Sequence, residues 1–192
     1  MNYRIIFLMV VLMVATALSA GLEIKPDESE YSLSKEPRLE KMDSFLVAGI
    51  AVMDTMDPAL MMGAWEKFFD VFAYIPTAIG NELYGVNFVT EDYNPEKDTG
   101  YGYMAATAIS SEKELPEGLT VRKIPASEYL VFTHKGLLKY LSNTFEYIYG
   151  EYLPASKYKV LLSDALEIYG ADFKDDSPDS IIEIWVPVKS GE

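Results

Sequence analysis

The sequence of 192 residues predicts an α+β fold: a tandem βαββ duplication that forms a curved antiparallel sheet, with two main helices on one face and a ligand groove on the other. Two observations support this prediction. A strand, a helix and two further strands follow one another in the first half, and the same order returns in the second half. A strand, then a helix, then a hairpin favours an antiparallel sheet with its helices on one side.

The first half begins with nine apolar residues at 45–53, several of them β-branched, which is typical of a buried strand. Asp57 and Pro58 then form a helix start, because Asp caps helices and Pro is favoured at their first position. Apolar side chains recur at helical spacing as far as Phe72, and Pro76 stops the helix. Two predicted strands and a polar connection complete the half: 83–89, 100–108 and, between them, 91–98.

The second half repeats this order. A long strand is predicted over 120–133, with an interruption at Pro125. An apolar stripe from Leu137 to Ile148 predicts a helix that ends at Gly150. Two further strands are predicted at 165–169 and 181–188.

The first 20 residues differ in composition from the rest. Arg4 precedes ten apolar residues at 5–14, and small residues follow up to Ala20, which is the layout of a secretory signal peptide. An uncleaved N-terminal anchor is the alternative, although the apolar segment is shorter than the roughly 20 residues that span a bilayer. Residues 21–41 are predicted to be a linker with an edge strand near its end, and 42–190 the folded domain. We therefore expect an exported, periplasmic or extracellular protein, which contacts a membrane only if the anchor is retained.

Composition excludes several function classes. Acidic residues outnumber basic ones by 30 to 16, and a formal net charge of −14 argues against nucleic acid as a partner. The absence of cysteine removes disulfides, thiolate metal sites and thiol catalysis. His134 is the only histidine, so a multi-histidine metal cluster is excluded. We expect this residue to cap a helix or to lie at the surface. No cofactor and no metal site is expected.

Two carboxylates stand out on the last two predicted strands. Period-two alternation places Glu167 and Tyr169 on the face opposite Leu166 and Ile168. The same alternation places Glu183 and Trp185 together on the face opposite Ile182, Ile184 and Val186. Either carboxylate can simply face water on a half-exposed sheet. The functional interpretation is a ligand that is cationic or donates hydrogen bonds, held between carboxylates and aromatic rings.

Several stretches resemble the GyrI-like family, the small-molecule-binding domain shared with the effector domains of AraC-type and BmrR-type regulators. The resemblance covers about residues 43–189 and is most specific in the second half. Its motifs are LPEGL at 115–119, IPASEYLVFTHKG at 124–136, YLP at 152–154, LEIY at 166–169 and EIWVPV at 183–188. Trp65 and the YGV stretch at 84–86 match weaker features of the first half.

The resemblance implies a tandem βαββ fold and a pocket lined by aromatic rings with an acidic residue at its base. The family's pocket glutamate falls on Glu167, with Glu183 as the second candidate. The candidate walls of the pocket are Tyr169, Trp185, Tyr84 and Tyr103. Unlike the regulators, this sequence shows no DNA-binding domain and carries an export signal, so we do not expect it to regulate transcription.

Three functions remain open from the sequence. The first is an exported, non-enzymatic binding protein for amphipathic, cationic or heteroaromatic small molecules. The second is a hydrolase on the same scaffold, with Glu167 or Glu183 as general base and Tyr103 or Tyr169 as donor. The third is an interaction module whose groove receives a peptide or a lipid-like chain.

Overall fold

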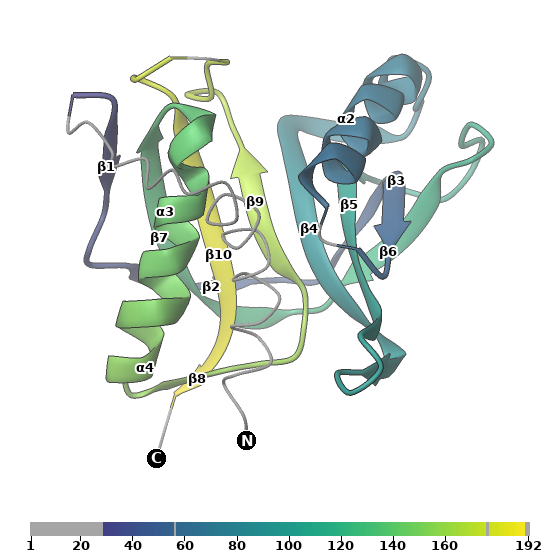
Figure 1. Cartoon of the computed structure of the whole chain (residues 1–192). Helices are drawn as coiled ribbons and strands as arrows, with labels where there is room; N and C mark the ends of the chain where they lie inside the picture. The colour runs from purple at the N-terminus through teal and green to yellow at the C-terminus, as the bar shows by residue number, and fades with distance from the viewer. Residues whose placement is uncertain (1–28, 56, 176, 191–192) are drawn as a thin grey trace.

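The computed structural model describes residues 29–55, 57–175 and 177–190, and the predicted signal peptide lies outside them. The α+β fold is confirmed: the strands form one mainly antiparallel sheet, and both main helices lie on one side of it (Figure 1). The described strands are β1 (Tyr31–Leu33), β2 (Arg38–Met42), β3 (Phe45–Met53), β4 (Ala78–Asn94), β5 (Thr99–Ile109), β6 (Thr120–Ile124), β7 (Ser127–Gly136), β8 (Tyr158–Val160), β9 (Ala165–Tyr169) and β10 (Ile181–Ser190).

The sheet order reflects the predicted duplication. The strands lie in the order β1-β7-β10-β9-β4-β5-β3-β6, with β2 beside β7 and β8 beside β10. The first unit supplies β4, β5 and β3, and the second supplies β9, β10 and β7 in the matching positions. The two units therefore meet where β9 pairs with β4. The predicted long strand over 120–133 is two strands, β6 and β7, because Pro125 has no N–H to donate to a ladder.

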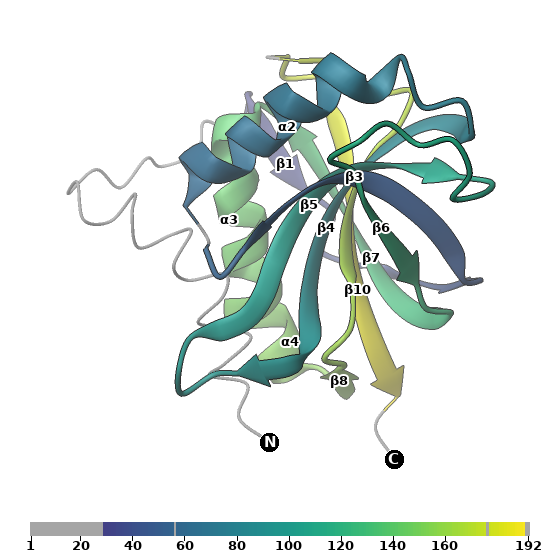
Figure 2. The same cartoon turned by 90° about the vertical axis from the view of Figure 1, so that its right-hand side faces the viewer.

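The helix of the first unit, α2 (Pro58–Phe72), begins as predicted. The Asp57 side chain accepts a hydrogen bond from the backbone N–H of Ala59 at 2.9 Å, which satisfies one of the free donors of the first turn. Ala64 and Phe68 of α2 are buried with side chains of β3 and β5, over which the helix lies (Figure 2). This packing fixes α2 above one half of the sheet.

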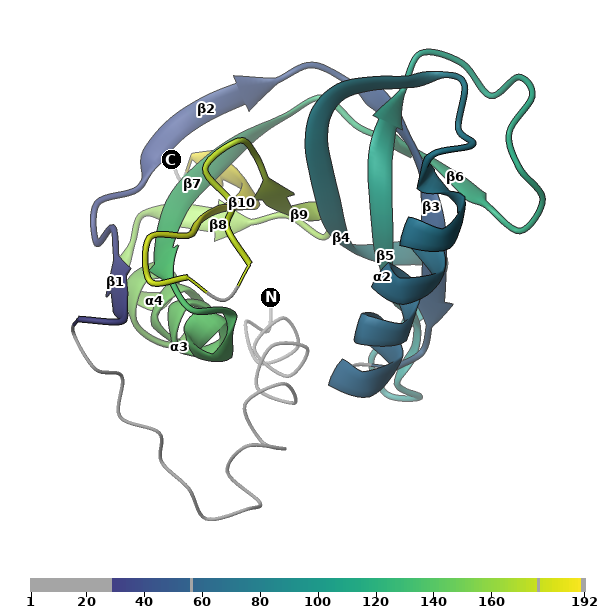
Figure 3. The same cartoon turned by 90° about the horizontal axis from the view of Figure 1, so that it is seen from above.

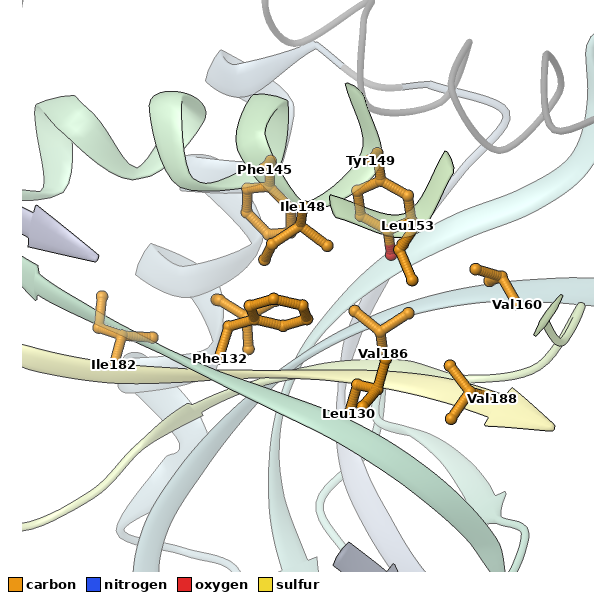
Figure 4. Close-up of a cluster of buried hydrophobic side chains, with 11 residues drawn as sticks. Leu130, Phe132, Phe145, Ile148, Tyr149, Leu153, Val160, Ile182, Val186 and Val188 are labelled. Atoms are coloured by element: carbon orange, nitrogen blue, oxygen red, sulfur yellow. The ribbon is translucent and has the colours of Figure 1, made fainter. Parts of the chain in front are cut away.

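The helical segment of the second unit continues beyond its predicted end at Gly150. It runs through the 3₁₀ turn η1 (Leu138–Tyr140), α3 (Leu141–Glu146), the π-helical turn η2 (Tyr147–Tyr152) and α4 (Leu153–Ala155). The reason is packing: Ile148, Tyr149 and Leu153, on both sides of the glycine, are buried against the sheet. Figure 4 shows this cluster, with the Tyr149 ring pointing its hydroxyl from the helix toward the sheet.

The predicted linker over 21–41 contains two strands, and only its part from residue 29 onward is described. The edge strand expected near its end is β2, and β1 is a second one. Both pair antiparallel with β7, whose other edge is taken by β10. The folded part therefore starts before Lys41. Strand β4 likewise extends into the predicted polar connection at 91–98, as far as Asn94, and β5 begins directly after it at Thr99.

The prediction that His134 caps a helix or lies at the surface is wrong. Its side chain is completely buried, and its Nδ1 lies 2.8 Å from the Thr144 hydroxyl. The Tyr31 ring packs on it at a centroid distance of 5.4 Å. Burial lowers the pKa of His134 to about 4. Among the described residues there is no group of acidic and histidine side chains that could hold a metal ion, and no helix long and apolar enough to cross a bilayer.

Candidate ligand site

The site is built on one row of residues that runs across the middle of the sheet. Paired residues of neighbouring antiparallel strands point to the same face, so the strand registers define the row. From β7 to β3 it contains Phe132, Ile184, Glu167, Gly85, Ala105 and Ile50. Its one charged member, Glu167, is 3% exposed and lies where the two βαββ units meet.

Three neutral side chains donate hydrogen bonds to the Glu167 carboxylate. The Tyr169 hydroxyl donates to Oε2 at 2.8 Å, and the Tyr103 hydroxyl donates to the same oxygen at 3.2 Å. The Asn87 amide donates to Oε1 at 3.1 Å. These donors stand two residues from Glu167, Ala105 and Gly85 along their strands, so period-two alternation puts them on the same face.

The helix α2 reaches this cluster through Trp65. Its indole N–H donates to the Tyr103 hydroxyl at 2.8 Å, and its ring meets the Tyr169 ring edge-on at a centroid distance of 5.2 Å. The Phe173 ring also meets the Tyr169 ring edge-on, at a centroid distance of 5.0 Å. From the second unit, the buried Tyr149 lies close enough to Glu167 for the carboxylate charge to raise its pKa, although burial raises it more. Side chains of both helical segments therefore surround Glu167.

Gly85 makes room for the carboxylate. A Cβ at this position would lie 2.5 Å from the Tyr103 hydroxyl and 2.7 Å from Glu167 Oε2. These distances are shorter than side chains tolerate, so a glycine at this point of β4 lets Glu167 and Tyr103 meet above the backbone.

The electrostatics of Glu167 are unusual for a buried carboxylate. Burial raises its pKa, and the three hydrogen bonds oppose that shift in part. The pKa values of Tyr103 and Tyr169 are raised, first by burial and then by the Glu167 charge, so both hydroxyls keep their protons. In the described part of the chain no Lys, Arg or His forms an ion pair with Glu167. By contrast, the buried Asp164 pairs with Arg122 at 2.5 Å.

The structure corrects the expectation that Glu167 and Glu183 share one groove on the face away from the helices. The register pairs Glu183 with Ile168 and Ile184 with Glu167, so the two carboxylates point to opposite faces. Glu167, Tyr103 and Tyr169 lie on the helix-bearing face. The alternation within each strand was predicted correctly. Which face of β9 corresponds to which face of β10, however, depends on the register of the two strands.

The remaining predicted site residues lie on the opposite face. Tyr84 is buried in the apolar cluster there, against which Trp185 packs, and the Tyr84 hydroxyl donates to Glu82 at 3.1 Å. Glu183 pairs with Arg38 of β2 at 2.6 Å and accepts a hydrogen bond from the Trp185 indole N–H at 2.9 Å. The second carboxylate beside an aromatic ring, Glu183, is therefore already paired with an arginine of the same chain.

Four residues contribute to the site without having been predicted as site residues from the sequence: Trp65, Gly85, Asn87 and Tyr149. Asn87 and Gly85 could have been found by extending the period-two pattern along β4, had the pairing of β4 with β9 been known. The sequence gives no signal that Tyr149 faces Glu167, because Tyr149 stands one residue before Gly150, where the helix was predicted to end.

Comparison with known proteins agrees with this architecture. The pattern of the family described as Cass2, integron-associated effector binding protein, matches residues 38–188. The transcriptional regulator BrlR of Pseudomonas aeruginosa is 24% identical over 153 residues, which are 79% of this chain and 54% of that protein. The chain thus spans about half the length of this curated relative.

Solved structures share the fold. An integron cassette protein from the mobile metagenome of Vibrio cholerae superimposes with a TM-score of 0.61 at 20% identity, over 83% of this chain and 99% of that one. SAV2435 bound to tetraphenylphosphonium gives 0.66 at 22% identity, over 80% and 94%. EcmrR in its complex with DNA gives 0.60 at 16% identity, over 97% and 68%. The resemblance to GyrI-like effector-binding domains is confirmed, and this chain belongs to the integron-associated effector binding protein family.

Proposed function

We propose that this protein is an exported, non-enzymatic binding protein for amphipathic organic cations, with Glu167 as the counter-charge. The observation that carries the proposal is the placement of Glu167: a buried carboxylate, surrounded by rings, whose hydrogen-bond donors are all neutral. An isolated buried charge is costly, and a bound cation would offset that cost.

The hydrogen bonds also indicate which cations suit the site. A carboxylate offers about four lone-pair positions, and Tyr169, Tyr103 and Asn87 occupy three of them at Glu167. A ligand with several N–H donors would find few acceptors there. A cation whose charge is spread over an apolar surface needs only the electrostatic attraction and the ring contacts of Trp65 and Tyr169. This favours phosphonium, quaternary ammonium and heteroaromatic cations.

Two further observations support the proposal. The chain belongs to a family of effector-binding proteins. SAV2435, which has a similar fold, has a solved structure with tetraphenylphosphonium bound. Export is supported by the sequence of residues 1–20 alone. The net charge of −14 supports a protein that works without nucleic acid, although EcmrR, which shares the fold, is known in complex with DNA.

A pair of ligands of opposite charge tests the proposal. Tetraphenylphosphonium and tetraphenylborate have nearly the same shape and differ in sign. At about 100 times its dissociation constant, a ligand that binds only the native state adds about 2.7 kcal/mol of stability. For a chain of this length that raises the melting temperature by roughly 5 to 10 °C. We expect this shift for the phosphonium and none for the borate. Equal shifts, or none for either ion, would contradict the proposal.

The hydrolase alternative uses the same residues. Glu167 accepts hydrogen bonds from both Tyr103 and Tyr169, and these are residues that the hydrolase alternative would use as general base and donor. A general base must accept a proton from water, however, and three donors already occupy this carboxylate. A turnover assay against strained electrophiles separates the two functions: hydrolysis that Glu167→Gln abolishes would favour the enzyme.

A further inference from the structure

A groove of about 610 Å³ lies at the carboxyl end of the second helical segment, where η2 and α4 lead into β8. Its volume is typical of a small-ligand pocket. Three tyrosine rings, Tyr147, Tyr152 and Tyr158, line it together with Glu151 and Lys157. Figures 1 and 2 show α4 and β8 at the end of the molecule opposite α2, and Figure 3 shows α3 and α4 over one part of the sheet and α2 over another. The lining residues are therefore different from those of the ligand site described above.

The π-helical turn η2 brings two of these rings together. Its backbone hydrogen bonds reach back five residues, as from the Leu153 N–H to the Ile148 carbonyl. Residues five apart point in different directions in an α-helix, whereas this wider turn brings them toward one side. The Tyr147 and Tyr152 rings accordingly lie at a centroid distance of 6.3 Å, with their planes tilted by 46°. A cation in the angle between the two rings can contact both of them, because cation–ring attraction extends to about 6 Å from a ring centroid.

Contacts with other parts of the chain hold both rings in place. The Tyr147 hydroxyl donates a hydrogen bond to the Lys35 carbonyl at 3.3 Å, in the stretch between β1 and β2. The Tyr152 ring meets the buried Phe132 ring of β7 edge-on, at a centroid distance of 5.1 Å. Rings that are held in this way before a ligand arrives lose little conformational entropy when it binds.

The charges in the groove indicate the class of ligand. Glu151 follows Tyr147 by four residues, so both stand on the same side of the helical segment. The Lys157 ammonium lies 5.4 Å from the centroid of the Tyr158 ring, so this third ring already contacts a cation. Within residues 29–55, 57–175 and 177–190, neither Glu151 nor Lys157 forms an ion pair. The groove therefore offers a negative charge beside the Tyr147 and Tyr152 rings and a positive charge beside the third ring.

We infer that this groove is a second ligand site, which binds a zwitterionic head group of the phosphocholine type. Its quaternary ammonium lies between the Tyr147 and Tyr152 rings beside Glu151, and its phosphate lies near Lys157. A quaternary ammonium has no N–H to donate, so ring faces and a nearby carboxylate are the groups that recognise it. The carbonyl end of the helical segment favours a cation at the same place. Such a head group belongs either to a free small molecule or to phosphatidylcholine in a membrane. The inference goes beyond the proposed function, because it does not involve Glu167.

Titration of phosphocholine into the full chain, followed by nuclear magnetic resonance, tests the inference. We expect saturable shifts of the backbone amide signals at 147–158. Tyr147→Leu and Glu151→Gln should each weaken binding about fivefold or more, because each removes a group that contacts the ammonium. Glu146→Gln is the matched control, since it removes an exposed carboxylate from the same helical segment, and it should leave the affinity unchanged. The absence of saturable shifts, or equal affinities in all three variants, would overturn the inference.

Two further variants locate the ligand. Lys157→Gln should weaken the binding of phosphocholine but not that of choline, which has no phosphate. An equal effect on both ligands would overturn the inference. Glu167→Gln should bind phosphocholine as the unchanged protein does, whether or not it still binds tetraphenylphosphonium. A loss of phosphocholine binding in Glu167→Gln would place this ligand at Glu167 and contradict a second site.

Vesicles distinguish the two sources of the head group. The full chain and Glu151→Gln are each mixed with phosphatidylcholine vesicles and separated by flotation. Vesicle binding that Glu151→Gln weakens identifies the lipid as the ligand. Equal vesicle binding of the two proteins, together with the expected phosphocholine titration, identifies a free molecule.

Discussion

Gly85 determines how closely Glu167 and Tyr103 approach each other. We predict that Gly85→Ala displaces the Tyr103 hydroxyl from the carboxylate and destabilises the fold by about 1–3 kcal/mol, because the added methyl overlaps both groups. Cation affinity should fall as well. Gly63→Ala is the matched control: its Cβ meets nothing within 4 Å, and alanine in the α2 interior should add about 0.5–1 kcal/mol. Urea unfolding measures the free energy of unfolding of both variants. An unchanged stability of Gly85→Ala would show that the row of residues around Glu167 is not tightly packed.

Glu167 should make both stability and ligand binding depend on pH. Its folded pKa is raised above the ordinary value of 4.5, so the folded state holds its proton to higher pH than the unfolded chain. The free energy of unfolding should therefore fall as the pH rises from 4.5 through the folded pKa. Cation affinity should rise over the same window, because the carboxylate form binds the cation. Denaturant titrations at several pH values measure the first effect, and Glu167→Gln should remove both. Identical pH profiles for the two proteins would contradict the assignment.

Among the elements, β1 pairs with β7 directly beside the buried His134. The titration of this histidine should change the stability in the opposite direction to that of Glu167. The folded pKa of His134 is about 4, below the ordinary 6.5, so the unfolded chain takes up this proton first. As the pH falls from 6.5 to 4, up to about 3 kcal/mol of stability should be lost. His134→Gln should flatten this acid limb of the stability profile, measured by urea unfolding. An equally steep loss in the variant would place its cause in other groups.

The sequence predicts the helices and strands more completely than it predicts the arrangement of the site. Alternation, helix caps and Pro125 gave the order and type of the main elements, because these signals are local. The sequence did not reveal that Glu167 and Glu183 point to opposite faces of the sheet. Ile168, and not Glu167, stands opposite Glu183, and this register depends on the whole sheet. The burial of His134 escaped prediction for a related reason: the Tyr31 ring, which packs on it, comes from more than 100 residues away in sequence.

At the scale of the whole molecule, the charge of −14 predicts that the protein does not bind duplex DNA on its own. Phosphate binding requires clustered basic groups, and acidic residues outnumber basic ones almost two to one. We expect no mobility shift of a 30-base-pair duplex, even at low salt where electrostatic binding is strongest. A shifted band that weakens as salt is added would contradict this expectation.

We expect the cation to be bound by one buried carboxylate, Glu167, and not by the general acidity of the chain. Glu183 provides the matched control, since it also stands beside an aromatic ring but pairs with Arg38 on the opposite face. Calorimetric titration of tetraphenylphosphonium into the protein, Glu167→Gln and Glu183→Gln tests the claim directly. We expect the affinity to fall about 10- to 100-fold, roughly 1.4–2.7 kcal/mol, in Glu167→Gln alone. Equal affinities in all three proteins, or a loss confined to Glu183→Gln, would contradict it.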